Sequence, residues 1–132
     1  MAPDRIDSLR QLIGEAVERD VTISQVVLEY EMEKGPHNRK VLLEKMLSNW
    51  LIMKQSVEEG LNKKEPTMGG LVKGAANTAR EGIMSGRIPN DRLSKTMARA
   101  LAVAEVNASM GVIVAAPTAG SCGILPAVLM TA

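Results

Sequence analysis

The sequence predicts an all-α fold: a compact helical domain of five to six helices, with a Gly/Pro-rich site loop before a final, truncated helix. Two observations predict it. Apolar residues recur at helical spacing through most of the 132 residues. The chain also holds no Phe, one Trp and one Tyr, so its core must be built from aliphatic side chains and Met, which suit close helix packing. A hydrophobic content of 45% is enough for one core.

The first two helices are expected over about 5–19 and from about 23 to 34. Apolar residues of the first follow the i, i+3, i+4, i+7 pattern of one helical face. Thr22 and Gln25 have the spacing of a capping box, which predicts where the second helix begins. Gly35 is expected to close it in the left-handed conformation.

A third and longer helix is expected to begin after Asn38, a residue type favoured as N-cap, and to run to Gly60. Trp50 lies on its apolar stripe and is interpreted as a core or interface residue. Residues 61–70 have the composition of a connecting loop.

Two further helices are expected over 71–84 and about 91–109. The first is rich in Gly and Ala, which suits tight packing against a neighbour. The second is expected to have Asn90 as its N-cap and Asp91 in its positive first turn.

The last 26 residues, 107–132, carry no charge, and the function is sought there. Glu105 and Asn107 are polar residues in the apolar half of the preceding helix. Because buried polar groups need partners, each is expected either to make a structural hydrogen bond to loop backbone or to position the loop at 116–123. Prolines and glycines within the uncharged segment would leave backbone groups unpaired in lipid, so buried core is expected and not a membrane span.

The loop at 116–123 is too broken for an ordinary helix or strand. Val112–Ala116 is expected to be extended or irregular, because Pro117 biases the residue before it. A helix start preceded by Gly, Ser and Thr is a natural site for a carboxylate or phosphate. Cys122 lies near that start, where a thiolate is stabilised, which suits a nucleophile or metal ligand. Single cysteines in apolar surroundings are usually inert core residues, and on spacing alone both readings stay open.

Charge and cysteine content exclude several classes. A net charge of +1 with interleaved acids and bases gives no case for nucleic acid or an anionic membrane. A lone cysteine excludes an internal disulfide framework and fits a reducing cytoplasm, and no apolar signal segment opens the chain.

The residues of the C-terminal segment resemble a known family. Glu105–Gly111, followed by Val114–Gly123 and Ile124–Leu129, closely resembles the alpha chain of the iron-sulfur L-serine dehydratases, also called L-serine ammonia-lyases. The resemblance extends over most of the chain, including Ile23–Met32 and Gly69–Gly70.

The resemblance implies a lyase of amino-acid degradation and gluconeogenesis that converts L-serine to pyruvate and ammonia without pyridoxal phosphate. It implies a [4Fe-4S] cluster held by three cysteines, whose open iron acts as a Lewis acid on the substrate hydroxyl. It further implies an oligomer with a beta chain or beta domain as partner. Cys122 matches the first cluster cysteine, and no catalytic residue is assigned. The residues that match the loop lining the substrate are Pro117, Thr118, Ala119, Gly120 and Ser121.

The same resemblance indicates what the chain lacks. A cluster needs several thiolates, and this chain has one cysteine. The family's other cluster cysteines lie downstream of the helix in which the sequence stops. Residues 1–132 are therefore expected to be the N-terminal part of an alpha-chain helical domain that lacks its C-terminal cluster-binding part, and to be inactive alone.

Two other readings stay open. The loop could be the phosphate-binding part of a pyridoxal-phosphate lyase, which needs a Schiff-base lysine, and no lysine follows Lys95. Alternatively, the chain is a non-catalytic helical interaction module whose uncharged C-terminus is an interface.

Overall fold

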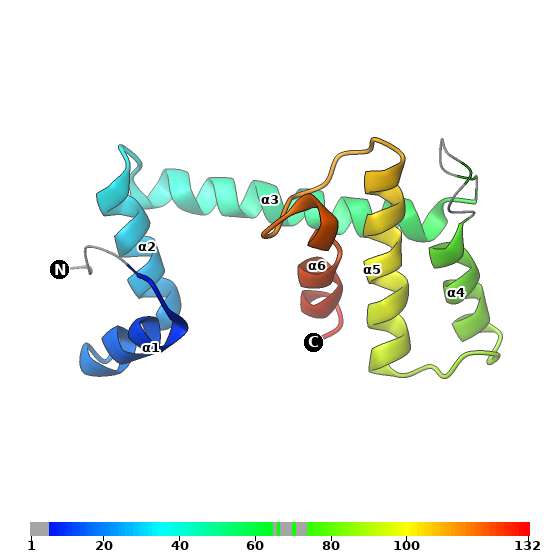
Figure 1. The fold of residues 1–132 in the computed structure, drawn as a ribbon, viewed down its shortest axis with the longest axis horizontal. Coiled ribbons are helices and arrows are strands. Elements are labelled where there is room, and N and C mark those ends of the chain that lie inside the picture. The colour runs from blue at the N-terminus through cyan, green and yellow to red at the C-terminus, as the bar shows by residue number, and fades with distance from the viewer. Residues whose placement is uncertain (1–5, 65, 67–69, 71–73) are drawn as a thin grey trace. The chain divides into compact units, whose positions relative to one another are not determined.

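The computed structural model describes residues 6–64, 66, 70 and 74–132, and over these residues every regular element is helical. The prediction of an all-α fold of five to six helices is confirmed. Besides a short 3-10 helix, η1 (Ala119–Ser121), the elements are α1 (Leu9–Glu18), α2 (Ile23–Lys34), α3 (Arg39–Asn62), α4 (Ala75–Met84), α5 (Arg92–Ala108) and α6 (Ile124–Leu129) (Figure 1).

The chain divides into two units, one ending at Leu47 and the other beginning at Ser48. In the N-terminal unit, α1 and α2 pack against each other and bury Ala16 and Val26. An ion pair between Arg19 and Glu29 joins the two helices. The first part of α3 also belongs to this unit, and the rest of α3 belongs to the other.

The start of α2 has the expected capping box. The backbone N–H of Gln25 donates to Thr22 Oγ1 at 3.3 Å, and the N–H of Thr22 donates to Gln25 Oε1 at 3.0 Å. The end of α2 differs from the prediction, because Gly35 is extended, with φ −140° and ψ 167°. The next residue is Pro36, which favours an extended conformation in the residue before it, and Gly35 has that conformation.

Helix α3 begins as predicted and ends later. The N–H of Val41 donates to Asn38 Oδ1 at 3.0 Å, which confirms Asn38 as the cap. The helix continues past Gly60 to Asn62. Gly60 lies inside the helix, where the absence of a side chain lets α5 approach closely. A Cβ built on Gly60 would lie 2.1 Å from the carbonyl oxygen of Ala102 on α5.

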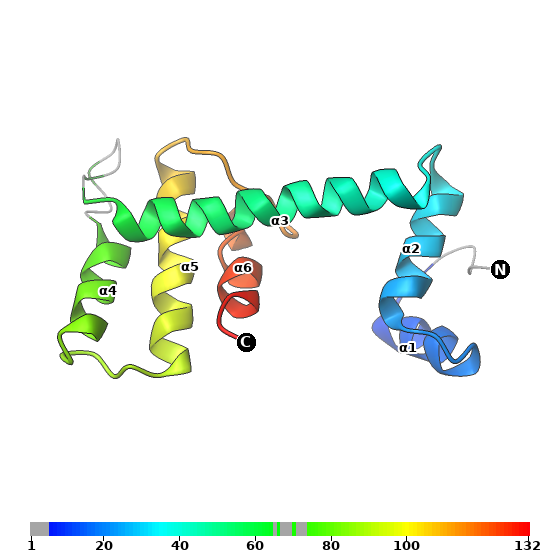
Figure 2. The same cartoon turned by 180° about the vertical axis from the view of Figure 1, so that it is seen from behind.

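In the C-terminal unit α5 lies between α4 and α6 and packs against both (Figures 1 and 2). The part of α3 that belongs to this unit crosses α5 at Gly60. The core of the unit contains Val57 of α3, Val103 of α5 and Cys122. The core thus joins three segments that are distant in the sequence.

The starts of α4 and α5 differ from the prediction. Helix α4 begins at Ala75, after Gly74 at φ 67°. Residues 71–73, where this helix was expected to begin, lie outside the described residues, and so does Gly69. Asp91, and not Asn90, is the N-cap of α5: its Oδ1 accepts a hydrogen bond from the N–H of Ser94 at 2.7 Å. This hydrogen bond lowers the pKa of Asp91.

Candidate functional site

The loop between α5 and α6 leaves the helix through a tight turn. Met110 has φ 61°, and the N–H of Gly111 donates to the carbonyl oxygen of Val106 at 2.9 Å. A Cβ on Gly111 would lie 2.5 Å from Cγ1 of Val106, so the turn requires glycine. Residues 112–116 then have no regular structure, as the sequence predicted. The Ala116–Pro117 bond that follows is cis.

The predicted substrate-lining residues form the surface of this loop. Pro117, Thr118, Ala119 and Gly120 are exposed, and Ser121 is half-buried. The structure therefore brings these five residues together in one accessible turn. Sequence reasoning did not anticipate the side-chain pairing within it.

That pairing joins two hydroxyls. Thr118 Oγ1 lies 3.1 Å from Ser121 Oγ, and Ser121 Oγ lies 3.4 Å from the carbonyl oxygens of Ala116 and Thr118. The N–H of Ser121 also donates to the carbonyl oxygen of Thr118 at 3.2 Å. The turn thus presents two adjacent hydroxyls, which can each donate or accept a hydrogen bond to a polar ligand.

Asn107 holds the loop from the last part of α5. Its Nδ2 donates to the carbonyl oxygen of Ala119 at 3.1 Å. The sequence predicted either a structural hydrogen bond to loop backbone or a loop-positioning role for Asn107, and this contact fits both.

Glu105 makes a structural hydrogen bond of another kind, to the start of α4 and not to loop backbone. Its Oε1 accepts hydrogen bonds from the N–H groups of Ala75 at 2.6 Å and Ala76 at 3.2 Å, at the start of α4. A carboxylate is stabilised there by the unpaired N–H groups and the positive end of the helix dipole. The residue is 2% exposed, and Oε2 is buried without a hydrogen-bond partner among the described residues. The sequence shows only a polar residue in an apolar stretch, and nothing in it marks α4 as the partner.

Cys122 faces the interior. Its side chain is 2% exposed and lies in the core with Val57 and Val103, with Ile113 and Met130 packed against the cluster. Burial raises the pKa of the Cys122 thiol, and hydrogen bonds from backbone N–H groups only partly oppose the change. The lowered thiol pKa that a helix start would give is therefore not found, and Cys122 as a metal ligand stays a prediction of the family resemblance.

A complete iron-sulfur cluster does not fit the residues of this chain by themselves. The chain has one cysteine, and the described residues contain no group of three or more His, Cys, Asp or Glu placed to hold a metal ion. Several thiolates are needed for such a cluster. Any cluster would have to draw most of its ligands from other protein segments.

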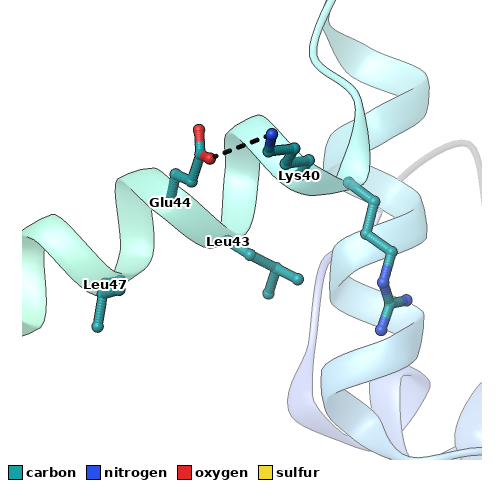
Figure 3. Close-up of a pocket in the computed structure, with 5 residues that line it drawn as sticks. Lys40, Leu43, Glu44 and Leu47 are labelled. Carbon is teal, nitrogen blue, oxygen red and sulfur yellow. Dashed lines mark ion pairs between the residues drawn. The ribbon is translucent and has the colours of Figure 1, made fainter.

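Two surface hollows lie away from the loop. One, of about 460 Å³, lies along the start of α3, where Leu43 and Leu47 project from one side of the helix and Lys40 pairs with Glu44 at 3.9 Å on another (Figure 3). This ion pair is largely exposed and contributes little to stability, and Arg39 also lines the hollow. The other lies between α4 and α5, and Lys95, the last lysine of the chain, lines it together with Arg80 and Arg99.

Within the part of the chain that the structure describes, no helix combines the length and apolar character needed to cross a bilayer. The interpretation of the uncharged C-terminal segment as buried core is partly right. Pro126 and Ala127 are buried, whereas Ile124 and Leu129 are more than half exposed.

Comparison with known proteins gives relatives of one kind. The chain is 38% identical over 128 residues to the L-serine dehydratase alpha chain of Peptoniphilus asaccharolyticus, covering 96% of this chain and 44% of that one. It is 32% identical to the probable L-serine dehydratase alpha chain of Bacillus subtilis (strain 168), covering 92% and 41%. It is 30% identical to L-serine dehydratase 1 of Escherichia coli (strain K12), covering 96% and 29%. The chain thus spans less than half the length of these relatives.

No solved structure matches the chain. The family model described as serine dehydratase alpha chain matches residues 18–132, which include the second helix, the core and the whole of the loop. This protein therefore belongs to the serine dehydratase alpha chain family.

Proposed function

We propose that this chain supplies the substrate-binding loop of an L-serine ammonia-lyase, which converts L-serine to pyruvate and ammonia. The observation that carries the proposal is the exposed turn of Pro117 to Ser121, anchored by Asn107, in a chain whose relatives are named L-serine dehydratases. In a substrate complex, the hydroxyls of Thr118 and Ser121 would bind the polar groups of serine.

The chemistry sets what such a loop must do. The reaction removes a proton from the α-carbon and expels the β-hydroxyl, and the resulting enamine hydrolyses to pyruvate and ammonia. A loop that fixes the carboxylate and hydroxyl of serine in one orientation lowers the entropic part of the barrier. Thr118 and Ser121 are assigned to this positioning, and proton transfer is not assigned to any residue of this chain.

The complete enzyme of this proposal carries a [4Fe-4S] cluster and acts in the cytoplasm. Cys122 is the one thiol that this chain offers to the cluster. The other partners of the proposal are a beta chain or beta domain and further copies in an oligomer. Because the chain spans 44% of the Peptoniphilus relative, catalysis is expected only when the remaining segments are present.

Binding of L-serine to the isolated chain tests the proposal by NMR. L-serine is expected to shift the amide resonances of 117–121, and L-alanine, which lacks the hydroxyl, is expected to shift them less. Thr118→Ala combined with Ser121→Ala should remove the response. Thr96→Ala is the control, because the Thr96 hydroxyl donates to the carbonyl oxygen of Arg92 within α5, away from the loop. If serine leaves the loop resonances unchanged in the parent chain, the loop is not a serine site.

A second candidate function, a helical interaction module, is favoured by an apolar stripe on α5. Leu93, Met97 and Leu101 follow each other at intervals of one helical turn and are 68%, 58% and 41% exposed. Such a stripe indicates a contact with another protein segment. Met97→Lys should then reduce self-association in sedimentation velocity, whereas Met84→Lys, at an exposed methionine of α4, should not.

A further inference from the structure

The hollow between α4, α5 and the end of α3 combines three cations with an apolar lining. It has a volume of about 340 Å³ and lies entirely within the C-terminal unit. Arg80 comes from α4, and Lys95 and Arg99 come from α5, one turn apart. Leu61 and Ile83 also line it, and none of the described side chains that line it is acidic.

Both arginines are held by uncharged partners, and no acidic side chain of the described residues pairs with either of them. Arg80 Nη1 donates to Asn62 Oδ1 at 2.8 Å, and Arg99 Nη1 donates to Thr131 Oγ1 at 2.5 Å. Both acceptors are uncharged, so neither of these two hydrogen bonds offsets the positive charge of its guanidinium group. Glu81, the acid that follows Arg80 on α4, lies 4.0 Å from Lys64 and does not line the hollow.

Arg80 carries a further unused donor. Its Nε is buried and has no hydrogen-bond acceptor among the described residues. Three like charges around one hollow repel each other. An anion bound in the hollow would relieve this repulsion.

We propose that this hollow binds an organic carboxylate with a short apolar body. The carboxylate would accept hydrogen bonds from Arg80 and its neighbours, because guanidinium groups match carboxylate geometry. The apolar body would lie against Leu61 and Ile83. L-serine is a poor fit, since its ammonium group would face three cations. The site is separate from the loop at 116–123, none of whose residues lines the hollow.

NMR of the arginine Nε–H resonances of the 132-residue chain tests the proposal directly. Hexanoate is expected to shift the Arg80 Nε–H resonance in a saturable manner, and to bind more tightly than acetate because of its hydrocarbon chain. L-serine should leave this resonance unchanged. The proposal is overturned if hexanoate produces no saturable shift, or if acetate binds as tightly as hexanoate.

Two charge-removing variants separate a built site from general electrostatics. Lys95→Gln removes one exposed cation of the hollow and should weaken hexanoate binding on the order of three- to tenfold. Arg87→Gln removes a cation on the turn after α4, where Arg87 donates to Ser85, and should leave the affinity unchanged. Equal weakening by both variants would show that the anion responds only to net charge and would contradict the proposal.

Discussion

The side-chain amide of Asn107 donates to the carbonyl oxygen of Ala119 at 3.1 Å and so ties the last part of α5 to the middle of the exposed loop. Two residues earlier on the same helix, Glu105 accepts hydrogen bonds from the first N–H groups of α4. One helix thus fixes two neighbouring segments through two polar side chains. A single substitution removes the hydrogen bonds of either side chain, and we expect the two substitutions to have different effects on loop order and on stability.

Asn107→Ala should disorder the loop at little cost to the fold. Loss of one partly exposed hydrogen bond costs about 1 kcal/mol of unfolding free energy. The loop amides of 117–121 are expected to broaden, and serine binding should weaken by about tenfold, because the loop must then be ordered at the expense of binding. Asn38→Ala is a matched control: it removes the cap of α3 at a similar cost and should leave the loop resonances and serine binding intact. Unchanged loop resonances in Asn107→Ala would contradict a positioning role.

Glu105→Ala should destabilise the fold much more. It leaves the N–H groups of Ala75 and Ala76 without their acceptor and opens a cavity where a buried side chain lay. Together these effects predict a loss of about 2–4 kcal/mol in urea unfolding followed by circular dichroism. Glu44→Ala, at a largely exposed ion pair of α3, should change stability little. Equal stability of the two variants would show that the buried carboxylate contributes nothing net.

The sequence predicts the helices well, because apolar periodicity and capping residues are local signals. It fails by one residue at α5, since Asn90 and Asp91 are both good N-caps and only the backbone path selects Asp91. Gly60 has the signature of a helix end, yet its role is to let α3 approach α5 at Ala102, a contact far away in sequence. The thiol pKa of Cys122 could not be predicted for the same reason. Its position near a helix start is a local feature, whereas its burial against Val57 is a contact between distant residues. The loop residues were identified by family resemblance, and their hydrogen bonds could come only from the structure.

Gly60→Ala should be strongly destabilising, although alanine is the better helix former. The added Cβ would lie 2.1 Å from a backbone oxygen of α5, which no side-chain movement can relieve. We expect a loss of several kcal/mol, on the order of 3, and a lower melting temperature. Gly14→Ala is the opposite control: nothing lies within 4 Å of its Cβ position in α1, so helix propensity should stabilise that helix by about 0.5–1 kcal/mol. If both variants behave alike, the close approach of α3 and α5 is wrong.

The buried thiol of Cys122 predicts a specific pH dependence. Its pKa in the folded chain is raised by burial, so the neutral thiol stabilises the fold fully below the thiol pKa of the unfolded chain. That contribution is lost as the pH rises through the higher pKa of the folded chain. Unfolding free energy should therefore fall at alkaline pH in the parent chain and fall less in Cys122→Ala, after each is compared with its own value at neutral pH.

Iodoacetamide should alkylate Cys122 far more slowly in the folded chain than in urea at the same pH, because the thiolate is scarce and the sulfur is 2% exposed. Fast alkylation of the folded chain at neutral pH would mean that the thiol leaves the Val57–Val103 core readily, as a cluster ligand would have to do.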